Sequence, residues 1–208
     1  MMTTVLLVRH GQTAWNLEDR FRGQVDLPLD DHGLEQAEVV GKRIASDWQP
    51  AAIYASSLQR TLQTAAAVSR ACGLRTAIHD GLLDIDFGEF SGLTPEAAAS
   101  QYPDLARAWR RTPHTVHFPD GELLADVRDR AEAALREIVA NHPDQTVVLV
   151  THVVVCRLLL CSLLGVDSDH FWQFQPAIAS ISVFEISGER SVLLSVNDTC
   201  HLATVHTS

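Results

Sequence analysis

Apolar runs alternate with segments of helical spacing along most of this chain. Residues 5–8 (Val-Leu-Leu-Val) are a continuous apolar run, typical of a strand that is buried on both faces, and residues 146–150 predict another strand. Asp30 is the expected cap of a helix whose apolar positions, from Leu34 to Ile44, keep a spacing of three to four residues. The same reading predicts further strands near residues 52–55, 75–78, 181–186 and 192–196, and further helices over residues 58–72, 124–141 and 153–164.

Polar residues and glycines set the expected ends of these elements. Ser57 is predicted to cap the helix that runs to about Cys72, and Gly73 follows at the position where helices commonly end. The pattern is irregular from residue 80 to 122, where Thr94-Pro95-Glu96 predicts a short helix start and later prolines interrupt the chain. We expect this stretch to form a helical insert.

Strands that alternate with helices predict an α/β fold with a mainly parallel sheet covered on both faces. No linker, repeat or low-complexity tract divides the chain, so residues 1–208 are predicted to form a single domain. In such sheets the ligand lies beyond the carboxyl ends of the strands. Arg9 and His10 follow the first strand, and His152 follows the strand over residues 146–150. The sequence therefore predicts a site where these ends meet.

Charge and composition exclude several classes of partner. The formal net charge is −10 over 208 residues, which argues against nucleic acid, and an anionic substrate would need a local group of cations. The apolar run over residues 153–164 is interrupted by Arg157 and is too short to cross a membrane. The first residues lack the features of a signal peptide, so we expect a cytoplasmic protein without a membrane partner.

Histidine, arginine and carboxylate are the residue types that phosphomonoester hydrolysis needs. A neutral imidazole such as that of His10 is a competent nucleophile, and arginines such as Arg9 and Arg60 offer forked N–H donors that match phosphate. These groups require neither a metal ion nor another cofactor. The four cysteines show no zinc-binding spacing, and His114 and His117 have no clear third ligand beside them, so no metal is predicted.

Several motifs together resemble the histidine phosphatase superfamily, also called phosphoglycerate mutase-like. Arg9 to Asn16 (RHGQTAWN) is similar to the RHGxTxxN signature of this family. The family's second arginine motif resembles residues 56–65, its FGxxxG stretch resembles residues 87–92, and its GE and final histidine motifs resemble Gly121-Glu122 and Thr151-His152. The resemblance covers nearly the whole chain and implies a three-layer α/β/α sandwich, with the segment at about 80–122 covering the active site.

The resemblance also implies roles for individual residues. His10 would attack phosphorus and become phosphohistidine, which water then hydrolyses. The residues expected to bracket the phosphoryl group are Arg9, Arg60 and His152. The residues expected to bind substrate in the same pocket are Asn16, Arg22, Gly23 and the backbone N–H of Val153.

The proton donor is where this sequence departs from the family. The family usually has a glutamate in this stretch, and the aligned carboxyl here is Asp84, which is one methylene shorter. Asp84 would protonate the leaving oxygen, which requires its pKa to be raised by burial beside Leu83 and Ile85. Asp86 is the rival candidate, with a poorer alignment.

The sequence therefore predicts a metal-independent phosphatase that acts on a small phosphorylated metabolite. The alternative is a phosphoglycerate mutase, which would return the phosphoryl group to a second hydroxyl, although the insert is shorter than in mutases of the family. A catalytically inactive binding module is a further alternative. Sugar phosphates, phosphoglycerate, phosphoserine and α-ribazole phosphate are all candidate substrates. Edge strands near the C-terminus allow a homodimer.

Overall fold

The computed structural model describes residues 1–205 and is built around a mixed β-sheet. Within these residues the sheet has six strands in the order β3-β2-β4-β1-β5-β6. The first four strands run parallel to one another, and β5 and β6 are antiparallel to their neighbours. The strands are β1 (Thr3–Arg9), β2 (Pro50–Ala55), β3 (Thr76–Ile78), β4 (Thr146–Thr151), β5 (Ile181–Ser187) and β6 (Arg190–Asp198). The mainly parallel sheet predicted from the sequence is confirmed.

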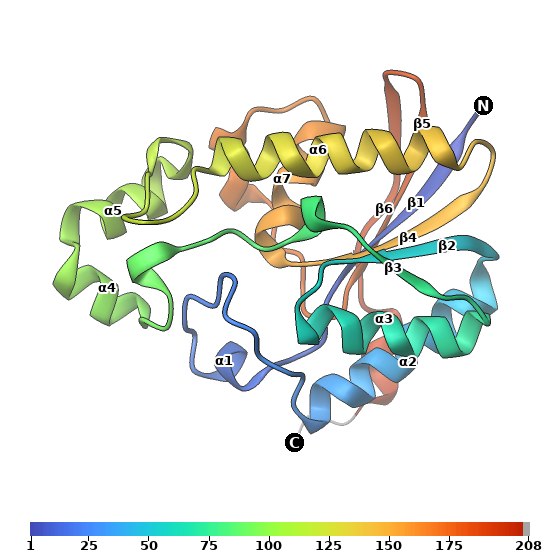
Figure 1. Cartoon of the computed structure of the whole chain (residues 1–208), viewed down its shortest axis with the longest axis horizontal. Coiled ribbons are helices and arrows are strands. Elements are labelled where there is room, and N and C mark those ends of the chain that lie inside the picture. Colours follow the sequence, from blue (N-terminus) through green and yellow to red (C-terminus); the bar gives the residue numbers. More distant parts are fainter. Residues whose placement is uncertain (206–208) are drawn as a thin grey trace.

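Helices cover both faces of the sheet, as Figure 1 shows. The helices are α1 (Ala14–Leu17), α2 (Asp31–Asp47), α3 (Gln59–Cys72), α4 (Pro95–Gln101), α5 (Pro103–Arg111), α6 (Leu124–Asn141) and α7 (Val153–Leu163). α6 and α7 lie on one side of the sheet, and α2 and α3 lie on the other. α4 and α5 extend to one side of these layers (Figure 1).

The central strand β1 has an unbroken apolar run because both of its faces are buried. Its side chains alternate between two cores, because successive residues of a strand point to opposite faces. Val5 and Leu7 pack with residues of α6 and α7, whereas Leu6 and Val8 pack with residues of α2 and α3. The α/β/α sandwich is thus confirmed, with β1 buried between its two helical layers.

Three of the predicted helix ends agree with the structure, and one does not. The Asp30 side chain accepts a hydrogen bond from the N–H of Gly33, and the Thr94 hydroxyl accepts one from Ala97. Gly73 has φ +69°, which favours glycine at the end of α3.

Ser57 does not cap α3, so this part of the prediction was wrong. The helix begins after Leu58, and the Ser57 side chain is exposed. The carboxylate of Asp26 accepts hydrogen bonds from the backbone N–H of Gln59 at 2.7 Å and from its side chain at 3.0 Å. The acceptor at this helix start therefore comes from a loop 33 positions earlier in the chain.

β6 forms the free edge of the sheet and carries exposed apolar side chains, at Val192, Leu194 and Val196. Its pairing with β5 is irregular at two points. A homodimer formed through this edge stays a prediction. In the part of the chain that is described, no helix combines the length and the apolar character that crossing a membrane requires.

Candidate active site

The carboxyl ends of β1 and β4 bring two histidines together. Arg9 pairs in register with Thr151 across these parallel strands, and the N–H of His10 donates to the carbonyl of Thr151 at 3.0 Å. His152, the next residue, is the N-cap of α7. The centres of the two imidazole rings lie 5.3 Å apart, and both residues are buried, with 1% and 0% exposure. The sheet thus places the two predicted histidines side by side.

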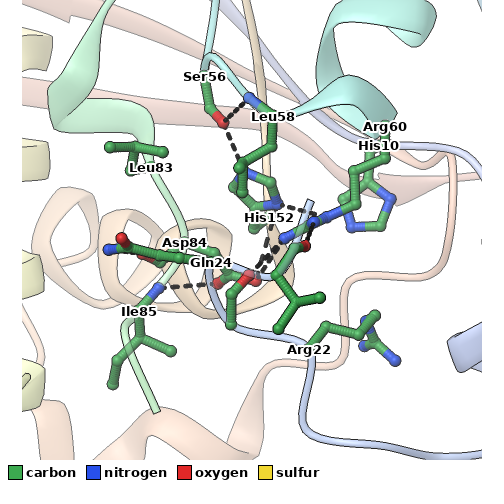
Figure 2. A network of polar contacts seen from close by, with 12 residues as sticks. His10, Arg22, Gln24, Ser56, Leu58, Arg60, Leu83, Asp84, Ile85 and His152 are labelled. Atoms are coloured by element: carbon green, nitrogen blue, oxygen red, sulfur yellow. Dashed lines mark hydrogen bonds and ion pairs between the residues drawn. The ribbon is translucent and has the colours of Figure 1, made fainter. Parts of the chain in front are cut away.

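Arg60 links the second histidine to the loops around it (Figure 2). It lies near the start of α3 and is completely buried. Its Nε donates to Nδ1 of His152 at 3.1 Å, and its Nη2 lies 3.3 Å from Oδ2 of Asp84. The carbonyls of Gly23 and Val25 accept from Nη2 and Nη1 at 2.6 and 2.8 Å. The guanidinium therefore has a fixed position beside both groups.

Asp84 projects from a loop to the same place. Its Oδ2 is 3.7 Å from Nδ1 of His152, and its Oδ1 accepts the N–H of Ile85 at 3.0 Å. Burial raises the pKa of this carboxyl, although the positive charges of Arg60 and Arg22 act in the opposite direction. The Asp84 carboxyl therefore holds a proton more readily in this environment than it would in water.

His10 has one ring nitrogen available for reaction. Burial lowers its pKa well below the ordinary value, and the charges of Arg60 and Arg9 lower it further, so the ring is neutral near pH 7. Nδ1 lies 2.7 Å from the carbonyl of Gly11. Because a carbonyl can only accept, Nδ1 carries the proton and Nε2 keeps its lone pair. The ring is thus arranged as a nucleophile that attacks through Nε2.

The contacts of His152 also define its tautomer. Burial, followed by the charge of Arg60, lowers its pKa well below the ordinary value. Nδ1 accepts from Arg60, so Nε2 carries the proton and donates to the hydroxyl of Ser56 at 2.8 Å. Ser56 was not predicted from the sequence. Its position at the carboxyl end of β2, next to β4 in the sheet, is a signal that could have identified it.

A cavity of about 560 Å³ opens beside this cluster. Five of the predicted residues line it, namely Arg9, Arg22, Gly23, Asp84 and Val153. The segment over residues 80–122 contributes Phe87, Pro95, Glu96, Trp109 and Arg110 to the wall. Trp172 and Arg157 also line the cavity, and neither was predicted from the sequence as a site residue.

Arg9 has an unused donor at this cavity. Its Nη1 donates to the carbonyl of Pro176 at 2.7 Å, but its buried Nε has no hydrogen-bond partner within residues 1–205. Burial, followed by the charge of Arg22, lowers the pKa of this guanidinium to about 10, so it remains positively charged at neutral pH. A buried N–H without an acceptor is costly, and an anion in the cavity could supply the acceptor.

The remaining predicted residues differ in how closely they join the cluster. Arg22 is near enough for its charge to affect the pKa of His10, while its Nη1 donates to the carbonyl of Trp15 at 3.0 Å. Asn16 is the third residue of the short helix α1, and its Oδ1 accepts from the N–H and the hydroxyl of Thr13, the residue that caps this helix. Asp86, the rival acid, accepts the N–H of Gly88 instead. Asn16 and Asp86 thus have local structural contacts.

Within residues 1–205, no three His, Cys, Asp or Glu side chains lie close enough together to hold a metal ion. The four cysteines, Cys72, Cys156, Cys161 and Cys200, are free thiols.

Comparisons with known proteins show similarity over nearly the whole chain. The family model of the histidine phosphatase superfamily (branch 1) matches residues 5–199. Phosphoserine phosphatase 1 of Hydrogenobacter thermophilus is 38% identical over 201 residues, which cover 97% of this chain and 95% of that protein.

Solved structures show the same extent of similarity. Bacillus stearothermophilus YhfR has a TM-score of 0.91 at 32% identity, covering 96% of this chain and 99% of its own. An alanine mutant of phosphoserine phosphatase from Entamoeba histolytica, in complex with phosphoserine, has a TM-score of 0.84 at 26% identity, covering 96% and 99%. Residues 5–199, which the family model matches, include every segment that contributes to the histidine cluster.

Proposed function

This chain belongs to the histidine phosphatase superfamily and is a phosphatase of that family, and we propose that it works without a metal ion, through a phosphohistidine on His10. The observation that supports this proposal best is the state of the His10 ring. It is neutral, its Nδ1–H is bonded to the Gly11 carbonyl, and its Nε2 lone pair is free to attack. Arg9 and Arg60 place positive charge beside it, and the buried Nε–H of Arg9, which has no acceptor within residues 1–205, is a donor suited to a phosphoryl group.

The proposed reaction has two steps. In the first, Nε2 of His10 forms a bond to phosphorus while the bond to the leaving oxygen breaks, and Asp84 gives its proton to that oxygen. In the second, water attacks phosphorus, Asp84 takes a proton from the water, and the bond between phosphorus and His10 breaks. The products are the alcohol and inorganic phosphate, and both side chains return to their starting states.

We propose that the substrate is a small phosphorylated metabolite that carries a second anionic group. Arg157 supports this view, because its guanidinium lines the cavity. The guanidinium carbon lies over the ring of Trp172, 4.5 Å from the ring centre. Its Nε and Nη2 donate to Phe174 and Gln175, whereas its Nη1 has no hydrogen-bond partner within the described residues. Relatives named for phosphoserine fit a substrate with a carboxylate.

A pair of substrates tests the second anionic group. Phosphoserine and phosphoethanolamine differ by one carboxylate, so we expect a higher kcat/KM for phosphoserine in the wild type. Arg157→Met should remove most of this preference while leaving hydrolysis of phosphoethanolamine nearly unchanged. An equal kcat/KM for the two substrates in the wild type would contradict the second anionic group.

The mechanism is tested with a generic aryl phosphate in excess EDTA, comparing the wild type with His10→Ala. Hydrolysis that survives the chelator and is lost in His10→Ala is the expected result. Hydrolysis that the chelator abolishes would contradict a metal-independent mechanism. If the wild type hydrolyses no phosphate ester, assay with phosphoglycerates would test the mutase alternative.

A further inference from the structure

We propose that Arg130 and Glu122 form a clamp that positions Asp84 for proton transfer. This inference rests on the proposed role of Asp84 as the proton donor. Neither clamp residue lines the cavity, and their side chains are 23% and 25% exposed. Both are therefore positioning residues, which act on the reaction through the backbone that carries Asp84.

Arg130 holds the chain immediately before and at Asp84. It projects from α6, and its Nη1 donates to the carbonyl of Leu83 at 2.6 Å and to that of Gly81 at 3.2 Å. Its Nη2 donates to the carbonyl of Asp84 itself at 2.9 Å. One side chain thus binds three carbonyls within four residues, and hydrogen bonds from a charged donor are stronger than neutral ones.

Glu122 holds the chain on the other side of Asp84. Its two carboxylate oxygens each lie 3.0 Å from Arg130, at Nε and Nη2, in a bidentate pair. The same Oε2 accepts the backbone N–H of Asp86 at 2.9 Å, and the N–H of Glu122 donates to the carbonyl of Asp86 at 2.9 Å. The pair therefore fixes the backbone on both sides of Asp84.

Asp84 needs this support because regular secondary structure does not hold it. It lies in an irregular stretch between two short 3₁₀ turns, Asp80–Leu82 and Gly88–Phe90. An aspartate has only two side-chain torsions, so the position of its backbone largely determines where its carboxyl lies. The distances from Oδ2 to Arg60 and His152, 3.3 and 3.7 Å, thus depend on this loop. A small displacement would move the proton away from the leaving oxygen.

The dependence of activity on the leaving group distinguishes positioning from general support of the fold. p-Nitrophenolate leaves readily without a proton, whereas the alkoxide of glycerol phosphate needs one. We expect Arg130→Met to lose roughly 10- to 100-fold more kcat/KM on glycerol phosphate than on p-nitrophenyl phosphate, as expected for partial loss of general acid catalysis. Glu122→Gln should show the same selectivity to a smaller degree.

Arg128 supplies the matched control on the same helix. Its side chain is exposed and pairs with Asp129 and Glu132 on α6. Arg128→Met should change kcat/KM on both substrates by less than about twofold, as is usual for surface substitutions. Arg130→Lys keeps the charge without the forked geometry, so it should show the selective loss even if Arg130→Met folds poorly.

Asp84→Asn separates failure of the clamp from failure of the proposed acid. If Asp84→Asn shows the selective loss and the folded Arg130 variants lose activity equally on both substrates, the clamp is overturned. If Asp84→Asn shows no selective loss, the role of Asp84 is wrong and the clamp falls with it. The clamp also predicts that adding Arg130→Met to Asp84→Asn causes no further selective loss.

Discussion

Replacement of Ser56 by alanine tests the environment of His152 most sharply. The Ser56 hydroxyl accepts the Nε2–H of His152 at 2.8 Å and the backbone N–H of Leu58 at 3.3 Å. All three residues are buried. The Thr61 hydroxyl also lies 3.1 Å from this oxygen, but its single proton has two carbonyl acceptors nearby, so Thr61 would keep a partner. Ser56→Ala therefore leaves two buried N–H groups without an acceptor.

The size of the effect follows from that count. Each unsatisfied buried donor costs about 1–3 kcal/mol, and the contact to Leu58 is long, so the free energy of unfolding should fall by about 2–4 kcal/mol. In a protein of this size each kcal/mol lowers Tm by about 2–4 °C, which predicts a decrease of at least about 4 °C. Urea unfolding and thermal melts followed by circular dichroism measure both quantities.

Ser57→Ala is the control for this substitution, because the neighbouring serine is exposed. It should change the unfolding free energy by less than about 0.5 kcal/mol. ¹⁵N NMR of the histidines should also show the Nε2–H tautomer of His152 in the wild type. Arg60 still donates to Nδ1 in Ser56→Ala, so the tautomer should persist there, while the Nε2–H resonance shifts because it has lost its acceptor. Equal stability of the two variants, with an unchanged Nε2–H resonance, would refute this role of the hydroxyl.

Three further predictions concern pH and the loop turns. Burial lowers the pKa of His10, so kcat/KM should persist well below pH 6.5. Burial raises the pKa of Asp84, so kcat/KM should fall as rising pH removes the proton of this carboxyl. A profile of kcat/KM against pH checks both the acidic and the alkaline side. Between pH 7 and 5 the histidines of the unfolded chain take up protons, whereas buried His10 and His152 do not. The urea concentration at the unfolding midpoint should therefore fall over this range, and it should fall less in His152→Gln. At Gly88, with φ +51°, a Cβ would lie 1.9 Å from the carbonyl of Pro119, so Gly88→Ala should lower Tm far more than Gly73→Ala, where the space is open.

Most of the fold could be predicted because it depends on local patterns. The apolar run of β1 is buried on both faces as expected, and α6 begins and ends at the predicted residues. The start of α3 could not be predicted, because its acceptor is Asp26 from a distant loop. The local sequence indicates which side chains contact one another only when they belong to the same helix, strand or turn.

The candidate site shows the same division. His10 and His152 could be placed together from the rule that ligands bind at the carboxyl ends of parallel strands, and the structure does bring them together. The contacts of Arg130 with the loop could not be predicted, because its partners are backbone carbonyls. Every residue has a carbonyl, so the side chains of the loop residues do not reveal these contacts. The roles of the individual site residues stay predictions until they are tested.

The most direct test of the mechanism is detection of the phosphorylated enzyme. The wild type and His10→Ala would be mixed with substrate, quenched in alkali within milliseconds, and examined by intact mass and peptide mass spectrometry, because phosphohistidine is stable in alkali and labile in acid. A mass increase of one phosphoryl group, located on His10 and absent from His10→Ala, is the predicted result. Rapid turnover in the wild type with no phosphoryl group on His10, or with the group on another residue, would contradict the proposed mechanism.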